Sequence, residues 1–322
     1  MIRVSLNPLV LHGWHFGQTV FALCNYPALL TSGILQLKES QDPFIEDYPA
    51  EVFMELLDSY PGLLDHLTSG EEEDIIHVGE MLGKGASDMR GDDTKTLKSA
   101  VIKWLVPRGQ VVIPPLSRNM KSDRGFNHEV MGALLCPAGL DWSNVETKEC
   151  LKSGETTVCG DQWPIFLYAG YVYDPEDPWK GLLRSNILVY GFKHVFTSPS
   201  SVDKEPKATC SGNTYLHGMK SVTRGSLAYI AMQVRFSLSS SSVFSRTNTV
   251  TDSENFYHSI LDLLEDPYKS EEVGDLMMWW THRVFPNSLS LQRSISKNSM
   301  LSKIHKKMIM QIEGGGSHRR KV

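Results

Sequence analysis

Apolar residues recur every three to four positions along most of this chain, a spacing that places them on one face of an α-helix. The segment 223–238 shows the pattern most clearly, with Leu227, Ile230, Ala231, Val234 and Leu238 in step. Only Val111–Ile113 is a candidate for a short strand. The periodicity therefore predicts a mostly α fold: a single helical globular domain with three long ordered loops and little or no β-sheet.

Capping and breaking residues divide this pattern into separate helices. Carboxylates at 71–74 favour the positive end of a helix dipole, and Asp92 or Asp93 can cap another helix. Thr251 and Glu254 have the spacing of a capping box. The expected helices are 49–60, 71–85, 92–105, 144–152, 179–196, 223–238, 251–264 and 270–285.

Three segments without helical periodicity interrupt the helices: 106–143, 160–178 and 197–222. They are nevertheless rich in large apolar side chains, including Phe126, Trp142, Trp163, Phe166 and Leu216, with Trp179 directly after the second segment. Free loops would not keep such side chains in water. We therefore expect the three loops to be ordered, to contact one another and to form the functional face.

The charge is divided unevenly between the body and the end of the chain. Residues 286–322 hold eight Lys and Arg against one acid, a net charge of +7, whereas 1–285 hold 24 basic and 36 acidic residues. The acidic body argues against a broad nucleic-acid-binding face, which needs clustered cations. We predict a helical domain at 1–285 and a basic tail at 286–322, partly helical or disordered.

Two hypotheses for the tail stay open. It can fold back onto the acidic body, or it can make a weak contact with nucleic acid or an acidic partner. In the second case, His318–Lys321 resembles a nuclear-import signal. Nucleus and cytoplasm are not distinguished.

Cysteine usage and hydropathy indicate the compartment. The five cysteines are odd in number, widely spaced and without a C-x-x-C pair, so we expect free thiols and no zinc ribbon. No run of apolar residues is long enough to span a membrane. The sequence predicts a soluble, intracellular protein without membrane contact. Whether its N-terminus is truncated stays open.

Familiar catalytic motifs are missing from the sequence. The segment nearest to a phosphate-binding loop, Gly79–Gly85, has the wrong spacing and lacks the hydroxyl that binds magnesium. No G-x-G-x-x-G follows a strand, and neither H-E-x-x-H nor G-x-S-x-G occurs. We expect no cofactor and no metal.

One dense polar segment, 123–129, remains as a catalytic candidate. Asp123, Arg124 and His128 surround a glycine, and together with Asp161 they could bind an anion or transfer protons. The structural alternative is that Arg124 pairs with an acid and His128 caps a turn.

Two further clusters are binding candidates. Asp174 and Asp177 belong to a D-P-x-D-P motif, and Trp179 follows it directly. The paired carboxylates could bind a metal, but the motif is more typical of a turn before a helix. Lys204 and Lys207 lie in a segment that is either an anion-binding loop or an ordinary solvated one. Trp163 is either a stacking platform or part of the core.

These same segments resemble a known protein family. The motifs are R-G-F-N-H at 124–128, L-L-C-P-A-G-L-D-W at 134–142, G-D-Q-W-P at 160–164, Y-D-P-E-D-P-W-K-G-L-L-R at 173–184 and F-T-S-P-S-S-V-D-K-E-P-K-A-T at 196–209. They are similar to an uncharacterised domain-of-unknown-function family that is expanded in mushroom-forming basidiomycete fungi. The resemblance covers about 12–285 and implies a basidiomycete source, without a known activity or known catalytic residues.

Two functional hypotheses follow. The first is a non-enzymatic intracellular module that binds an unknown protein partner. The second is an enzyme that acts on nucleic acid or a phosphorylated substrate through the loops around 123–128 and 160–179. Geometry separates them, because the enzyme requires Asp123, Arg124, His128 and Asp161 to converge in one pocket lined by Trp163 or Trp179.

Overall fold

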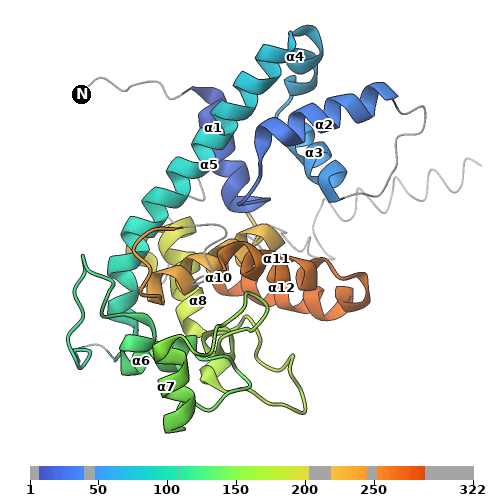
Figure 1. Cartoon of the computed structure of the whole chain (residues 1–322). Coiled ribbons are helices and arrows are strands. Elements are labelled where there is room, and N and C mark those ends of the chain that lie inside the picture. Colours follow the sequence, from blue (N-terminus) through green and yellow to red (C-terminus); the bar gives the residue numbers. More distant parts are fainter. Residues whose placement is uncertain (1–6, 40–47, 108, 203–218, 245–251, 287–322) are drawn as a thin grey trace, which may run out of the picture. The chain divides into compact units, whose positions relative to one another are not determined.

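The computed structural model describes residues 7–39, 48–107, 109–202, 219–244 and 252–286, most of which are helical (Figure 1). These ranges contain no β-strand, only two isolated bridges between 137 and 164 and between 168 and 182. The mostly α fold predicted from the periodicity is confirmed. Residues 1–284 form one compact unit and residues 285–322 a second, and the described structure belongs almost entirely to the first.

The helices follow one another with short connections in the first third of the chain and with longer loops after it. The α-helices are α1 Pro8–Thr19, α2 Tyr26–Glu39, α3 Tyr48–Ser59, α4 Leu63–Ser69, α5 Glu72–Ala100, α6 Glu129–Leu135, α7 Val145–Ser153, α8 Asn186–Phe192, α10 Arg224–Leu238, α11 Ser253–Glu265 and α12 Ser270–Val284. The short 3₁₀ or π turns are η1 Val101–Trp104, η2 Gly125–Asn127, η3 Ile165–Leu167, η4 Ala169–Tyr171, η5 Lys193–Thr197, η6 Pro199–Val202 and η7 Pro267–Lys269.

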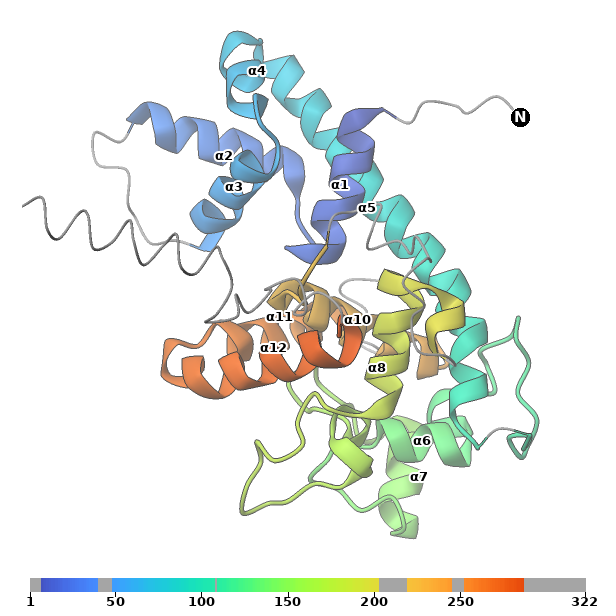
Figure 2. The same cartoon turned by 180° about the vertical axis from the view of Figure 1, so that it is seen from behind.

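Helix α10 is the centre of the core. Every residue from Gly225 to Leu238 is buried, as expected for a helix with apolar side chains on all sides. Helices α1, α5, α8 and α11 pack around it, and Figure 2 shows α8, α11 and α12 close to α10 from the opposite side.

Helices α1 and α5 cross at very short range because glycines line the crossing. A Cβ atom added at Gly13 would lie 2.0 Å from the carbonyl oxygen of Leu82, and one added at Gly85 would lie 1.9 Å from that of Val10. No larger residue fits at either position without moving a backbone. This crossing ties the N-terminal helices to the long helix α5.

A polar network joins α1, α5 and α10. The carboxylate of Asp93 accepts hydrogen bonds from Tyr229 Oη at 2.6 Å and from Gln18 Nε2 at 2.8 Å. Gln233 Nε2 donates to the Tyr229 hydroxyl, and Thr94 donates to Gln233 Oε1. Burial raises the pKa of Asp93 to about 6 against the pull of its two donors.

Two expected helix boundaries were wrong. Helix α5 is continuous from Glu72 to Ala100, whereas the sequence predicted a break between 85 and 92. Gly85 does not end it, because that glycine is needed at the contact with α1. The helix expected at 179–196 begins only at Asn186, because Gly181 and Leu183 before it adopt left-handed backbone conformations.

Three smaller corrections concern local structure. Val111–Ile113 is not a strand: Val111 and Ile113 are largely exposed and no neighbouring strand is described. The expected loop 106–143 contains helix α6. Asp252, in a left-handed conformation, precedes α11, and Thr251 of the expected capping box lies outside the described residues.

Loops 106–143 and 160–178 contact each other, as predicted. The amide of Ala138 donates to Trp163 O at 2.9 Å, and the amide of Ile165 donates to Cys136 O at 2.9 Å. Most of the third expected loop, including Lys204, Lys207, Cys210 and Leu216, lies outside the described residues.

Two further findings concern the cysteines and the hydropathy of the helices. Cys24, Cys136, Cys150 and Cys159 all keep their thiols, and no disulfide forms in the described part of the chain. Among the described helices, none is both long and apolar enough to cross a bilayer.

Candidate functional site

Arg124, the central residue of the catalytic candidate segment, is fully buried and bound to backbone carbonyls. Its Nη1 donates to Lys98 O at 2.8 Å and to Ser237 O at 2.9 Å, and its Nη2 donates to Ser117 O at 2.9 Å. The sequence suggested that Arg124 pairs with an acid, but its hydrogen-bond acceptors are carbonyls. The guanidinium therefore joins the C-terminus of α10 to the last turn of α5 and to the loop that contains Ser117.

Lys121 supports the same helix end. Its Nζ donates to Phe236 O at 2.5 Å and lies 3.4 Å from the centre of the Phe236 ring. Burial, together with the nearby cations Arg124 and Lys98, lowers the pKa of Lys121 to about 7. Cations near a helix C-terminus compensate its dipole, and this pair does so from inside the protein.

His128 caps helix α6, whereas the structural alternative predicted that it caps a turn. Its Nδ1 accepts from the amides of Val130 at 3.2 Å and Met131 at 3.4 Å, at the start of α6. Since Nδ1 accepts, Nε2 carries the proton and donates to Pro114 O at 3.0 Å. The ring is 1% exposed, so both nitrogens are occupied away from solvent.

The four catalytic candidates are not brought together. Arg124 and His128 are engaged in the core, and Asp123 Oδ1 is buried without a hydrogen-bond partner among the described residues. Asp161 is exposed on a different surface, in a cleft that contains none of the other three. The geometry required by the enzyme hypothesis is absent from the described residues.

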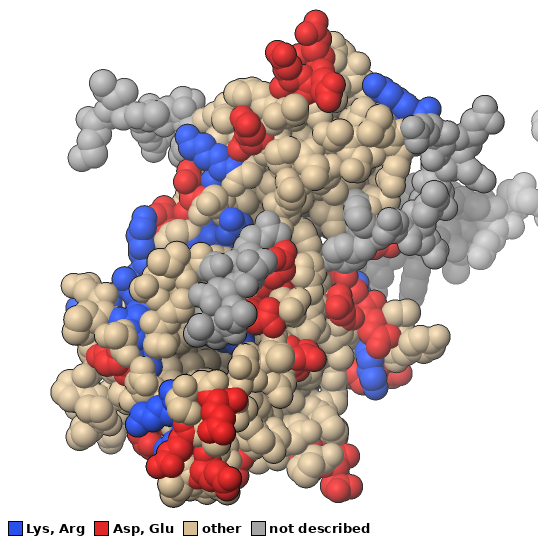
Figure 3. All heavy atoms as spheres, viewed as in Figure 1, with Lys and Arg blue, Asp and Glu red and all other residues tan. Residues whose placement is uncertain are grey.

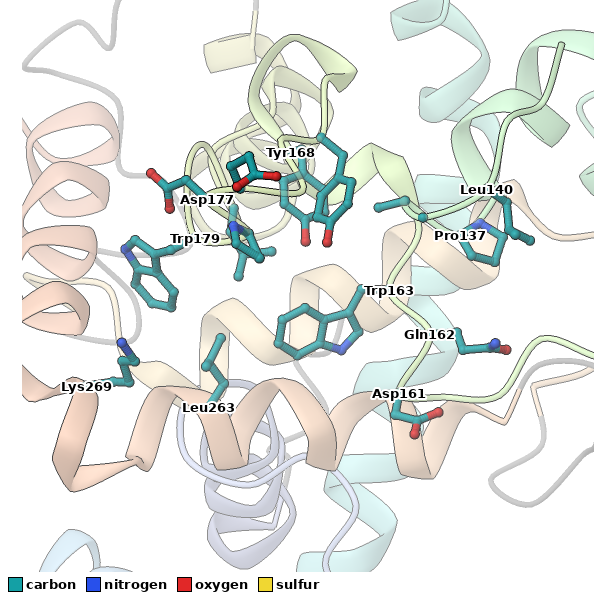
Figure 4. A pocket seen from close by; sticks show the side chains of 16 residues that line it. Pro137, Leu140, Asp161, Gln162, Trp163, Tyr168, Asp177, Trp179, Leu263 and Lys269 are labelled. Atoms are coloured by element: carbon teal, nitrogen blue, oxygen red, sulfur yellow. The ribbon is translucent and has the colours of Figure 1, made fainter.

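Asp161 lies instead in a cleft of 690 Å³ where several of the predicted binding residues meet. The cleft is formed by the turns 137–140 and 161–163, the segment 173–182, and residues of α11 and η7. Figure 4 shows Trp179 and Trp163 as separate walls, with Leu263 of α11 between them and Tyr168 above. The predicted residues Trp163, Asp177 and Trp179 thus share one cavity with Asp161.

Trp163 is positioned by helix α11. Its indole Nε1 donates to Ser259 Oγ at 2.9 Å, and the amide of Gly160 donates to Asp252 Oδ2 at 2.7 Å. A Cβ atom at Gly160 would lie 2.4 Å from the amide nitrogen of Phe256, so glycine is required for the loop to approach α11. Neither Ser259 nor Gly160 was a predicted site residue.

The D-P-x-D-P motif forms a turn, as its structural alternative predicted, and this turn leads to Trp179. Asp174 Oδ1 accepts from the Glu176 amide at 3.1 Å, and Lys180 Nζ pairs with Asp174 Oδ2 at 3.0 Å. That pairing, through the hydrogen bond from Lys180, lowers the pKa of Asp174. Asp174 is therefore a structural residue beside the cleft, and no helix starts directly after the turn.

A backbone bridge fixes the remaining aromatic wall. The amide of Ala169 donates to Gly181 O at 2.8 Å and holds Tyr168 opposite Leu182. The ring of Tyr168 contacts that of Tyr173 edge to face at 5.3 Å. Burial raises the pKa of Tyr168 to about 12, so its hydroxyl stays protonated at neutral pH.

The cleft carries more negative than positive charge. Asp161, Glu176 and Asp177 line it without an ion-pair partner in the described structure, whereas its one lysine, Lys269, pairs with Glu272 at 3.1 Å. Figure 3 shows the wider distribution: Lys and Arg follow the edge over α5, and carboxylates gather over the region of α11 and α12.

A second cavity of 740 Å³ also borders the turn 137–140, and no feature of the sequence predicted it. Its walls are mainly apolar and come from α6, Trp142 and the segment 171–173. Ala138, Leu140 and Tyr173 line both cavities. We call the first cavity the aromatic cleft and the second the apolar groove.

The described residues contain no group of three or more His, Cys, Asp or Glu side chains that could hold a metal ion. A family model, described as a family of unknown function (DUF6698), matches residues 84–285, more than half of the chain. No curated protein and no solved structure matches the chain. Both cavities lie within the matched residues.

Proposed function

Since the chain belongs to the DUF6698 family, whose function is unknown, we propose a function from its geometry: a non-enzymatic module that binds a protein segment in the aromatic cleft. The observation that carries this proposal is the convergence of Trp163 and Tyr168 of loop 160–178 with Trp179, directly after that loop, around one open cavity. Tryptophan and tyrosine are enriched in binding hot spots. Tyr168 is 3% exposed, whereas the two tryptophans are partly exposed. Their exposure otherwise costs free energy in water.

The surrounding structure supports binding rather than catalysis. The cleft walls are fixed by backbone bridges at 137–164 and 168–182 and by the hydrogen bond from Trp163 to Ser259. Preformed walls reduce the entropy lost when a partner binds. Meanwhile Arg124 and His128, the strongest acid–base candidates, have structural roles.

We include two expectations from the sequence in this proposal: an intracellular location and a basidiomycete source. The free thiols of Cys136, Cys150 and Cys159 support the first, because oxidising compartments favour disulfides. The basidiomycete source rests on the resemblance of the sequence motifs to that family.

The test uses short fluorescent peptides of basic, acidic and neutral composition, with binding to the full chain followed by anisotropy. We expect micromolar binding of at least one class and about tenfold weaker binding by a Trp179→Ala variant. Trp179 makes no side-chain hydrogen bond that the fold requires. Trp14→Ala, which removes a half-buried tryptophan of α1 outside the cleft, is the matched control.

The proposal fails if no peptide class binds. It also fails if Trp179→Ala and Trp14→Ala weaken binding equally, because the cleft would then have no special part in it.

A further inference from the structure

The walls of the aromatic cleft indicate what kind of side chain it accepts. Figure 4 shows Trp163 and Trp179 on two sides and Tyr168 on a third. The face of an aromatic ring attracts a cation that lies within about 6 Å of its centre, and tryptophan does so most strongly. A cavity with several such walls favours an ammonium or guanidinium group.

The polar residues of the cleft favour the same ligand. Asp161, Glu176 and Asp177 are exposed carboxylates at its edge. Both lysines in and beside the cleft are already paired, Lys180 with Asp174 and Lys269 with Glu272. A positively charged ligand would therefore meet three carboxylates without displacing an existing ion pair.

The apolar groove extends this surface. It shares Ala138, Leu140 and Tyr173 with the cleft, so the two cavities are adjacent. Among the residues that line the groove, Tyr171 is 40% and Val172 is 69% exposed. Neighbouring side chains of one extended segment could enter both cavities.

We infer that the partner is a protein segment with a lysine or arginine side chain in the aromatic cleft and an apolar side chain close by in sequence in the apolar groove. This inference rests on the proposed function and adds the chemistry of the partner. A phosphate-bearing ligand such as RNA or DNA fits less well, because the carboxylates of the cleft repel it.

The experiment compares four peptides that differ at two positions: Lys or Glu at one, and Leu or Ser at the other. Each is titrated into the full chain and followed by anisotropy, with a single-stranded oligonucleotide as a fifth probe. We expect the Lys–Leu peptide to bind about tenfold tighter than the Glu–Leu and Lys–Ser peptides, and raised salt to weaken its binding.

Two variants assign the contacts. The double substitution Asp161→Asn with Asp177→Asn keeps side-chain size and should reduce the preference for Lys over Glu about tenfold. Val172→Asp should reduce the preference for Leu over Ser and leave the preference for Lys in place. Asp65→Asn, on an exposed residue of α4, is the matched control and should change neither preference.

The outcomes separate this inference from the proposed function. If peptides bind in a Trp179-dependent way but Glu and Lys peptides bind equally, the inference is overturned and the proposed function stands. If no peptide binds, or if only the oligonucleotide binds and requires Trp179, both are overturned.

Discussion

At the scale of single residues, the buried cations of the 121–128 segment are part of the fold. Arg124 links the C-terminus of α10 to two other segments through backbone carbonyls in buried or partly buried surroundings. A residue kept for chemistry would face a cavity, whereas Arg124 is 0% exposed. Its removal should therefore appear in stability.

We predict that Arg124→Met lowers the free energy of unfolding by about 3 kcal/mol, because it removes hydrogen bonds to one buried and two partly buried carbonyls. Arg118→Met, on an exposed arginine six residues earlier, should change it by less than about 0.5 kcal/mol. Urea denaturation measures both. Equal stability of the two variants would contradict the structural role of Arg124.

Asp93 provides a pH-dependent test of the polar network. Its pKa is raised to about 6 from 3.8, chiefly by burial, so the folded state binds the proton more tightly than the unfolded state does. The stability that this proton adds is complete below pH 3.8 and is lost as the pH rises through 6. A shift of this size corresponds to about 2–3 kcal/mol.

Comparison with Asp93→Asn isolates that effect from other titrating groups. We predict that the free energy of unfolding of the natural chain, minus that of the variant, falls by about 2 kcal/mol between pH 4 and pH 8. Denaturation curves at several pH values measure the difference. A difference that stays constant, or rises with pH, would show that Asp93 is not held in this environment.

At the scale of elements, the crossing of α1 and α5 depends on two glycines. We predict that Gly85→Ala destabilises the protein by about 3 kcal/mol, because the new methyl group would meet the backbone of Val10. Gly91 lies on the same helix with open space around it. Gly91→Ala should stabilise the protein by about 0.5–1 kcal/mol.

Thermal melts of the two glycine variants give the comparison directly. If both substitutions stabilise the protein, helix propensity alone governs α5 and the close crossing with α1 does not exist in solution.

Much of the element order could be predicted from periodicity and caps, because both are local. Helix α10 follows its apolar spacing and its cap at Thr223, and α7 follows Asn144. The continuity of α5 could not be predicted in this way. It depends on Gly85 meeting α1, a contact between residues 75 positions apart in the sequence.

The residues of the candidate site also fall into two groups, those that local sequence signals indicate and those that depend on contacts between distant segments. Trp163, Trp179 and Asp161 were candidates because aromatic and acidic residues in irregular segments are visible in the sequence. Ser259 and Leu263 were not, because they belong to an ordinary amphipathic helix and acquire their roles only when α11 meets the loop at Gly160. The apolar groove likewise exists only in three dimensions.

At the scale of the whole molecule, the boundary at residue 285 remains a prediction. A chain that ends at Phe285 should melt within a few degrees of the full chain, because the tail differs from the body in charge and lies outside the matched residues. The full chain alone should bind DNA at low salt. In a plot of the logarithm of its DNA-binding constant against the logarithm of the salt concentration, the slope should be about −4 to −5, as for four to six phosphate contacts.

Either of two results would change this description. If truncation abolishes the melting transition, the tail belongs to the core. If neither form binds DNA, the nucleic-acid hypothesis is wrong, and the tail either folds back onto the acidic body or contacts an acidic partner.

The central claim, that the aromatic cleft is the binding site, is tested most directly by the indole Nε1–H signals of the seven tryptophans in nuclear magnetic resonance spectra. Trp163→Phe and Trp179→Phe variants assign the two signals from the cleft. On titration with the Lys–Leu peptide, we predict that these two signals shift most, while that of Trp280, buried against Leu183 O, stays in place. Saturating peptide that leaves both cleft signals unmoved, or moves all seven equally, would contradict the claim.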